Sequence, residues 1–346
     1  MTLIYKFEKF MQKNQKIWFS ILMCSLFLAG CFREPAKGIA ITSEQVTDPP
    51  LPDREIVFQL TSHYSGGPDD RIGFINSDGS GETYIEAEGV QAVVKPIWID
   101  DGSMLLFLHP SDSIEGITKE GYRVEFKGNY WMSNVSPIHE KDQVLIESSF
   151  DDHKTLKRID LSSGEVLETY QVANYIYHDL DGISESVEIG TNNLKKQKLV
   201  FSSYLWDETF QKYELKIYNT DTMESHSILS YGGDSKSIKQ IISPAFSPDG
   251  QWIAYTSDDG IYLIHPDGTE NHQIIKINPI NIGFWPPAAS WSPDGQWIVY
   301  HRCMLKSKES CRFNVEDSNI FKYNIGTGET EVLVEGGVNP YWRWDE

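Results

Sequence analysis

Basic residues are scarce in this sequence. Lysine and arginine together number 30, against 50 aspartates and glutamates, which gives a formal net charge of −20. Residues 1–30 hold four lysines and one glutamate, so the remainder carries a formal charge of −23. Nucleic acid and anionic lipid head groups repel such a surface, and we expect no nucleic-acid partner.

Catalytic signatures are also missing. The sequence contains no Gly-x-Ser-x-Gly elbow, no His-Glu-x-x-His, no phosphate-binding glycine-rich loop and no Gly-x-Gly-x-x-Gly after an expected strand. Its nine histidines show no ligand spacing, and the acidic stretch 179–182 lacks the remaining ligands of a calcium loop. We therefore expect no metal and no cofactor, and we assign no catalytic residue.

An apolar run long enough to cross a bilayer is missing as well. The run 17–28 holds about a dozen residues, whereas a spanning helix needs about 20. Four lysines precede the run, as in an export signal. Residues 28–31, Leu-Ala-Gly-Cys, resemble the lipobox of bacterial lipoproteins, in which the cysteine is acylated and the signal is cut just before it. The resemblance implies a signal peptide at 1–30 and a lipid on Cys31; a plain secretory signal and a short membrane anchor are the alternatives.

The segment that follows has the composition of a linker. Residues 31–52 are rich in proline, threonine, serine and glycine and show little apolar periodicity, which predicts a lipidated flexible tether. The folded domain is then expected to span 53–346. Stable attachment through acyl chains would place this domain outside the cytoplasm, on a membrane of the cell envelope or periplasm.

The most informative feature is an internal repeat. Residues 243–255 and 288–300 share an aromatic residue followed by Ser-Pro-Asp-Gly-Gln-Trp-Ile, at a spacing of 45 residues. Proline presets φ and glycine allows positive φ, so each Pro-Asp-Gly predicts a tight turn. Apolar residues alternate on either side, as in strands, and each copy leads into a further strand pair. The turn residues, to which we assign a structural role, are Pro248, Asp249, Gly250, Pro293, Asp294 and Gly295.

This four-stranded unit resembles the repeat of TolB-type, WD-like β-propellers. The resemblance is close over 243–334 and weaker before it, as at 96–107, where the turn proline is missing. Counting repeats predicts an all-β propeller of six four-stranded blades, with five or seven as alternatives. Strands expected at 55–59 and 71–79 have no opening strand before them, whereas 339–344 matches an opening strand. Pairing these two ends would close the ring and remove an open sheet edge.

Two cysteines remain outside the signal and lipobox. Cys303 and Cys311 lie in an expected hairpin loop, and in an oxidising compartment we predict a disulfide between them. Such a bond would contribute about 2–3 kcal/mol by restricting the unfolded chain. Two reduced buried thiols are the alternative, and two ligands are too few for zinc. Most tryptophans fall at repeat-related positions, and we expect them in the core.

Fold alone does not determine function. The TolB-like resemblance implies a membrane-anchored, non-catalytic scaffold or binding module for an envelope protein, peptide or glycan. We expect the loops 184–197 and 303–311 to carry specificity. The alternative is a carbohydrate-active enzyme, a glycan hydrolase or lyase with carboxylates in the channel. Its candidate carboxylates are Asp100, Asp179 and Glu208.

Overall fold

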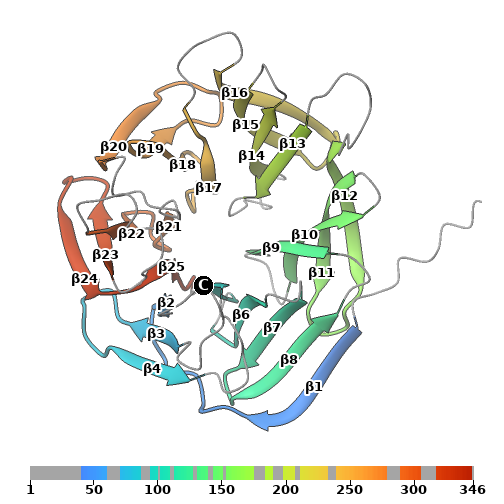
Figure 1. Cartoon of the computed structure of the whole chain (residues 1–346), viewed down its shortest axis with the longest axis vertical. Helices are drawn as coiled ribbons and strands as arrows, with labels where there is room; N and C mark the ends of the chain where they lie inside the picture. Colours follow the sequence, from blue (N-terminus) through green and yellow to red (C-terminus); the bar gives the residue numbers. More distant parts are fainter. Residues whose placement is uncertain are drawn as a thin grey trace, which may run out of the picture. The chain divides into compact units, whose positions relative to one another are not determined.

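Six antiparallel sheets are arranged around a ring (Figure 1). The computed structural model describes residues 40–60, 71–86, 94–99, 102–109, 113–127, 131–138, 143–150, 153–174, 184–189, 198–206, 211–232, 239–278, 289–304 and 317–344. The prediction of an all-β propeller with six blades is confirmed, and the alternatives of five and seven blades are wrong.

Each sheet is one blade, and its strands lie side by side in order from the centre of the ring to its outer edge. Blade 1 consists of β25 (Val338–Trp342), β2 (Ile56–Leu60), β3 (Arg71–Ile75) and β4 (Thr83–Glu86). Blade 2 consists of β5 (Val94–Trp98), β6 (Met104–His109), β7 (Ser113–Thr118), β8 (Tyr122–Lys127) and the additional outer strand β1 (Ala40–Thr47). Blade 3 consists of β9 (Trp131–Ile138), β10 (Gln143–Phe150), β11 (His153–Asp160) and β12 (Val166–Asn174).

The remaining three blades follow along the chain. Blade 4 consists of β13 (Ser184–Ile189), β14 (Lys198–Trp206), β15 (Gln211–Asn219) and β16 (Glu224–Gly232). Blade 5 consists of β17 (Ile242–Phe246), β18 (Ile253–Ser257), β19 (Gly260–Ile264) and β20 (His272–Lys276). Blade 6 consists of β21 (Ser290–Trp291), β22 (Trp297–Cys303), β23 (Ser318–Asn324) and β24 (Thr330–Glu335).

The core is divided among the spaces between neighbouring blades. The described residues form six apolar clusters, and each cluster joins two adjacent blades. Strand β2 illustrates the reason: successive side chains of a strand point to opposite faces, so Val57 packs toward blade 2, whereas Ile56 and Phe58 pack toward blade 6. Both faces of the strand are buried, which explains why the second strands read as continuous apolar runs.

Tryptophans contribute to these clusters as expected. Trp98, Trp291 and Trp342 are each at most 5% exposed. The indole Nε1 of Trp291, in blade 6, donates a hydrogen bond to the carbonyl oxygen of Ala245 in blade 5, at 3.2 Å. These indoles fill the wedge-shaped space between twisted sheets and link one blade to the next.

The two ends of the domain close the ring in blade 1, as predicted. Strand β25 pairs antiparallel with β2, with Ile56 opposite Trp342. The backbone N–H of Arg343 donates to the carbonyl oxygen of Glu55 at 2.7 Å, and the N–H of Trp342 donates to Ser290 Oγ in blade 6 at 3.0 Å. The last strand of the chain therefore supplies the first strand of the first blade.

The structure corrects the boundary drawn at residue 53. Strand β1 pairs antiparallel with β8 at the outer edge of blade 2, although the sequence assigns 40–52 to a tether. Asp48 forms a two-pronged ion pair with Arg123, at 2.6 and 2.9 Å, and its side chain is 4% exposed. Leu51 is buried in the cluster between blades 1 and 2. The tether prediction fails here because pairing with an open sheet edge satisfies backbone groups without any apolar periodicity in the segment.

A second correction concerns the expected insertion at 184–197. Residues Ser184–Ile189 form β13, which pairs with β14 over six residue pairs. This stretch is the innermost strand of blade 4, so it belongs to the scaffold of the ring.

Candidate functional site

The two Ser-Pro-Asp-Gly turns have the same geometry. In blade 5, Asp249 Oδ1 accepts hydrogen bonds from Ser247 Oγ at 2.6 Å and from the backbone N–H of Gln251 at 3.0 Å. Ser247 Oγ in turn accepts the backbone N–H of Trp252 at 2.9 Å. In blade 6 the corresponding bonds to Asp294 measure 2.5 and 2.9 Å. Each carboxylate thus organises its own turn, and the following tryptophan is placed at the start of the second strand.

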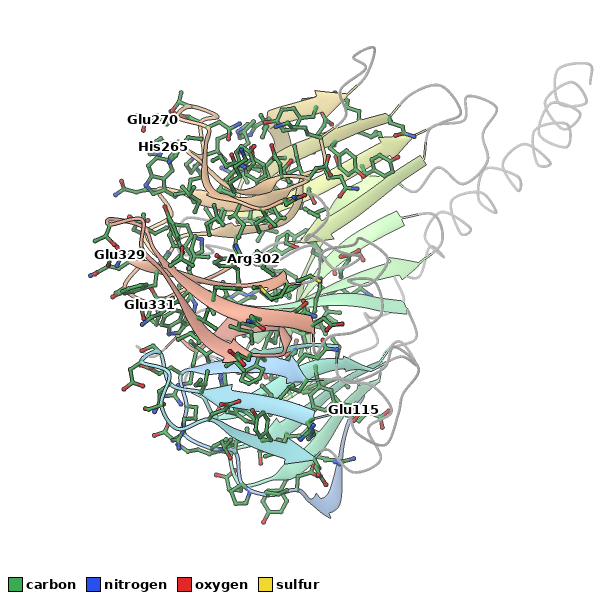
Figure 2. All side chains as sticks on the ribbon, turned by 60° about the vertical axis from the view of Figure 1, so that its left-hand side comes forward. Glu115, His265, Glu270, Arg302, Glu329 and Glu331 are labelled. Atoms are coloured by element: carbon green, nitrogen blue, oxygen red, sulfur yellow. The ribbon has the colours of Figure 1, made fainter. Side chains whose placement is uncertain are left out.

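These turns lie on one side of the ring together with the hairpins that join third and fourth strands. Figure 2 shows Glu270 of the β19–β20 hairpin, Glu329 of the β23–β24 hairpin and Glu331 near the start of β24 on the same side of the ring. We call this side the hairpin face and define it by the turns 247–252 and 292–297 and the hairpins 76–82, 265–271 and 325–329.

A pocket of about 450 Å³ opens on the hairpin face where the ring closes. It lies between blades 6 and 1 and therefore combines residues from the two ends of the domain. The size is within the range of about 300–1,000 Å³ that is typical of ligand sites. Its lining residues are Glu55, Ser77, Asp78, Ser292, Pro293, Asp294, Trp297, Lys322, Trp342 and Arg343.

Lys322 crosses the seam between the two blades. Its ammonium donates a hydrogen bond to the carbonyl oxygen of Ser77 at 2.9 Å and lies 3.0 Å from a carboxylate oxygen of Glu331. It also lies 4.7 Å from the ring centre of Trp297, within the range of a cation–π interaction. The side chain of Lys322 is 11% exposed, so this cation is held inside the pocket by groups of both blades.

Arg343 is the second cation of the pocket, and it is also paired. Its Nη1 lies 2.6 Å from Asp53 Oδ1, and its guanidinium lies 5.9 Å from the ring centre of Trp98. The hydrogen bond from Arg343 holds the pKa of Asp53 below its usual range, and the positive charge adds to the effect. Both pocket cations therefore already have acidic partners from this chain.

Three carboxylates of the pocket hold backbone groups instead of cations. Glu55 Oε2 accepts the backbone N–H of Ser77 at 2.5 Å, which joins the start of β2 to the β3–β4 hairpin. Asp78 Oδ1 accepts the backbone N–H of Ser80 at 2.8 Å, and bonds from Ser80 lower the pKa of Asp78. Asp294 serves its turn as described above. At neutral pH Asp78 is therefore ionised, and it has no ion pair within 4.0 Å among the described residues.

The inner strands carry a buried polar network that sequence reasoning missed. Asn339 Nδ2 donates to Gln59 Oε1 at 2.9 Å, and the backbone N–H of Asn339 donates to His301 Nδ1 at 3.2 Å. Asn339, Lys95 and Ser243 have positive φ of about 50°, and each directly precedes a proline in an innermost strand. The signal was present in the sequence. The second strands β2, β14, β18 and β22 share an apolar-apolar-aromatic-polar pattern, and three opening strands contain an X-Pro. Register shifts beside these three residues mark a β-bulge in each of these innermost strands. The side chains of the network are buried, with Gln59, His301 and Asn339 each less than 9% exposed.

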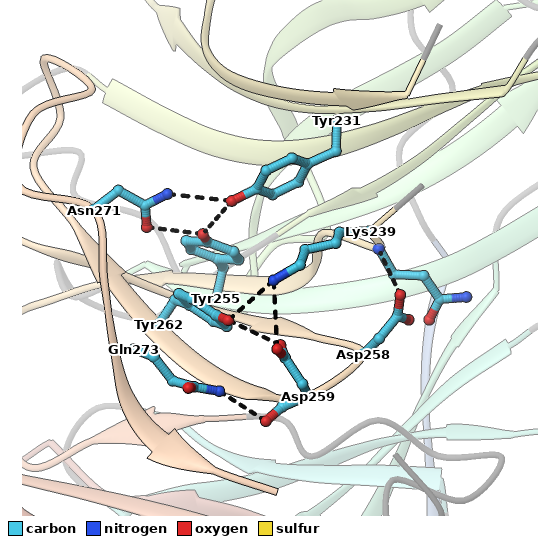
Figure 3. A network of polar contacts seen from close by, with 9 residues as sticks. Tyr231, Lys239, Tyr255, Asp258, Asp259, Tyr262, Asn271 and Gln273 are labelled. Carbon is cyan, nitrogen blue, oxygen red and sulfur yellow. Dashed lines mark hydrogen bonds and ion pairs between the residues drawn. The ribbon is translucent and has the colours of Figure 1, made fainter. Parts of the chain in front are cut away.

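Another polar network connects blades 4 and 5 (Figure 3). Tyr255 Oη donates to Asn271 Oδ1 at 2.9 Å, and Asn271 Nδ2 donates to Tyr231 Oη at 3.3 Å. Burial raises the pKa of Tyr255 far above its usual range, because the charged form would be desolvated. This tyrosine remains protonated, and its hydroxyl links the two blades.

The same figure shows a cation at the start of blade 5. Lys239 Nζ lies 3.4 Å from both Asp259 Oδ2 and Tyr262 Oη, and Tyr262 Oη donates to Asp259 Oδ1 at 2.9 Å. The hydrogen bond with Tyr262 is the main cause that raises the pKa of Lys239, and the nearby Asp259 carboxylate adds a smaller effect in the same direction. The group stays charged and ties the segment before β17 to the β18–β19 turn.

Several predicted site residues fall outside the described residues. These are Cys31, Cys311 and the three candidate carboxylates Asp100, Asp179 and Glu208. Cys303 is buried at the end of β22 and is disulfide-bonded. Since Cys311 is not described, the pairing of these two cysteines stays a prediction.

The described residues contain neither a metal cluster nor a membrane-spanning helix. Within the described ranges, no group of three or more His, Cys, Asp or Glu side chains is arranged to hold a metal ion. The same part of the chain contains no helix that is long and apolar enough to cross a membrane.

Comparison with known proteins yields structural matches alone. No protein-family model and no curated protein matches the sequence. TolB from Acinetobacter baumannii superposes with a TM-score of 0.60 at 12% identity, covering 84% of this chain and 67% of that one. A structure from Agrobacterium tumefaciens assigned as TolB gives 0.57 at 13% identity, covering 83% of this chain and 92% of the other. This chain has the TolB-like β-propeller fold.

A TolB-like propeller is thus the correct structural description of the domain. A chain in a nidogen/laminin complex matches with a TM-score of 0.55 at 7% identity, covering 83% of this chain and 97% of that one. At such identities the likeness establishes the fold and leaves function to the site itself.

Proposed function

We propose that the chain is a lipid-anchored, extracytoplasmic β-propeller that binds a protein of the cell envelope and does not catalyse a reaction. The observation that carries this proposal is the pocket between blades 6 and 1. Its two tryptophans and two cations are held in place by neighbouring groups of the same chain. A site of this kind presents a fixed, preorganised surface to a partner.

The lowered pKa of Asp78 in the pocket suits binding more than glycan hydrolysis. A glycosidase needs one carboxyl group with a raised pKa to act as the general acid. The carboxyl groups with shifted pKa among the described residues, such as Asp78 and Asp53, are all shifted downward. Such groups remain ionised at neutral pH and accept hydrogen bonds, which suits recognition.

The structural neighbours are consistent with a binding role. Two of them are called TolB, and another comes from a structure of a complex between nidogen and laminin. Propellers offer loops from several blades on each face of a rigid ring, so a partner can contact many segments at once. We extend this use to the present chain as part of the proposal.

Membrane attachment through Cys31 completes the proposal. The charge pattern, the short apolar run and the residues Leu-Ala-Gly before Cys31 all support acylation at this cysteine. Each buried methylene contributes about 0.8 kcal/mol, so more than one acyl chain would give stable anchoring.

The proposal is tested by cross-linking capture of the full chain in its own membranes, followed by titration of the purified captured protein against the purified full chain. We expect saturable binding at a defined stoichiometry. The same preparation is incubated with envelope polysaccharide, and new reducing ends are measured. Turnover of polysaccharide without a saturable protein partner would replace our reading with that of a carbohydrate-active enzyme.

A further inference from the structure

We infer that the pocket between blades 6 and 1 receives a cationic side chain, a lysine or an arginine, from the protein partner. This inference rests on the proposed function and adds the chemistry of the partner. The carrying observation is the pocket itself, which has a volume of about 450 Å³ and an indole ring in its wall.

The charge balance of the pocket determines the sign of the guest. The lining contains Lys322 and Arg343, but each is already paired, with Glu331 and Asp53 respectively. The lining carboxylates of Glu55, Asp78 and Asp294 bind backbone N–H or hydroxyl groups and have no cationic partner within 4.0 Å among the described residues. An anionic guest would meet uncompensated negative charge, whereas a cation would balance it.

The wall of the pocket already accommodates an ammonium group. Lys322 places its Nζ 4.7 Å from the ring centre of Trp297 and 2.9 Å from the carbonyl oxygen of Ser77. The indole face of Trp297 and the carbonyl oxygen of Ser77 therefore lie at distances that suit the primary ammonium of Lys322, which shows that this wall tolerates a cation. A second cation would enter beside Asp78 and Asp294, which are exposed at the mouth of the pocket.

The net charge of the chain supports the same partner chemistry. A formal charge of −20 attracts a basic segment over a distance of about a Debye length and repels an acidic one. The negative electrostatic field of the chain would bring a basic partner near, and the pocket would then bind one of its basic side chains.

The repeats supply matched controls for a test. Asp249 has the same turn contacts as Asp294 in the preceding blade, and it does not line the pocket. Asp267 Oδ1 accepts the backbone N–H of Thr269 at 2.9 Å, as Asp78 does with Ser80, and it also lies outside the pocket lining. An asparagine retains Oδ1 as an acceptor in all four turns, so the substitution removes charge and preserves the turn.

The experiment uses the purified full chain and the probe Nα-acetyl-lysine amide, which keeps its side-chain ammonium. Nα-acetyl-norleucine amide serves as the uncharged isostere. Binding is followed by the NMR shift of the Trp297 indole N–H, assigned with Trp297→Phe. We expect the lysine probe to shift this signal saturably and the norleucine probe to leave it in place. The double variant Asp78→Asn/Asp294→Asn should bind the lysine probe about tenfold more weakly, and the control Asp249→Asn/Asp267→Asn should bind it as the unmodified chain does.

Other results would overturn the inference. Equal shifts with both probes would show that charge is irrelevant, and equal weakening in both double variants would place the effect outside the pocket. The captured partner is then titrated against the same variants. Saturable binding of the partner that is unaffected by Asp78→Asn/Asp294→Asn would retain the proposed function and reject the cationic guest.

Discussion

At the scale of single residues, a glycine decides how the N-terminal segment attaches to the ring. Gly121 has a φ of +91°, and a Cβ built on it would lie 2.1 Å from the carbonyl oxygen of Asp48. The backbone N–H of Asp48 donates to the carbonyl oxygen of Gly121 at 2.8 Å. Only glycine allows these two chains to approach so closely in this conformation.

We expect Gly121→Ala to lower the free energy of unfolding by about 2–4 kcal/mol, because backbone atoms would have to separate and the backbone would be strained. Gly79→Ala is the matched control: its φ is +82°, and nothing lies within 4 Å of the added Cβ. This control should cost about 1 kcal/mol, from the left-handed conformation alone. Urea unfolding measures both, and equal losses would contradict the close-approach argument.

The carboxylate of Asp160 caps the β11–β12 hairpin. Its Oδ1 accepts the hydroxyls of Ser162 and Ser163 at 2.6 and 2.8 Å, together with their backbone N–H groups. These bonds, led by that from the Ser162 side chain, hold the pKa of Asp160 below its usual range.

An NMR titration should therefore give Asp160 a pKa below about 3.9, the ordinary value. Because the folded-state pKa is depressed, the stabilisation is fully present above about pH 4 and is lost as the pH falls through the folded-state value. Ser162→Ala/Ser163→Ala should move the pKa of Asp160 upward toward the ordinary value. A pKa that does not respond to this change would reject the hydrogen-bond explanation.

At the scale of elements, the closing strand β25 joins the two ends of the domain. It supplies Trp342 to the cluster between blades 6 and 1 and pairs with β2 across the longest sequence separation in the ring. Without this strand, β2 would become an unpaired inner edge and the pocket would lose two lining residues, Trp342 and Arg343.

A chain that ends at residue 336 should unfold at a lower urea concentration than the full chain, and the synthetic peptide 337–346 should restore the midpoint. Ligand binding to the folded state stabilises it in proportion to the logarithm of ligand concentration, so the midpoint should rise with the amount of peptide added. The same peptide with Trp342→Ala should restore much less, because that side chain is 5% exposed in the cluster. Restoration by a scrambled peptide of equal composition would show that the effect is unspecific.

At the scale of the whole molecule, the predicted attachment to a membrane and the fold of the propeller depend on different parts of the sequence. Strand β1 begins at Ala40, nine positions after the predicted lipid site at Cys31. A segment of this length spans at most about 30 Å when fully extended. If Cys31 is acylated, the propeller remains close to the membrane surface.

Cys31→Ser should release the exported chain from membranes and remove the acyl mass from its N-terminal peptide. Cys24→Ser is the control, because Cys24 lies in the apolar run of the predicted signal and leaves the lipobox intact. Membrane fractionation and mass spectrometry give the readout. Membrane retention of the Cys31→Ser chain would favour the short-anchor alternative.

Much of the fold was predictable because it is encoded locally. The Pro-Asp-Gly turns, the alternating apolar residues and the orphan opening strand at 339–344 led to six blades and a closed ring, and the structure confirms both. The attachment of β1 was not predictable, since an edge strand needs no apolar pattern of its own. Strand β13 was not predicted either, because the sequence analysis assigns its residues to a loop.

The sequence by itself therefore determined the blade unit and the mode of closure, because turns and strand alternation depend on residues close together in the chain. It predicted six blades but left five and seven as alternatives, and the structure decided between them. The tertiary structure alone decided the pocket. Lys322 and Ser77 meet there across 245 positions of sequence, and Trp342 joins them from the last strand. No local sequence pattern predicts these contacts, because they form only when the ring of six blades brings the two ends of the domain together.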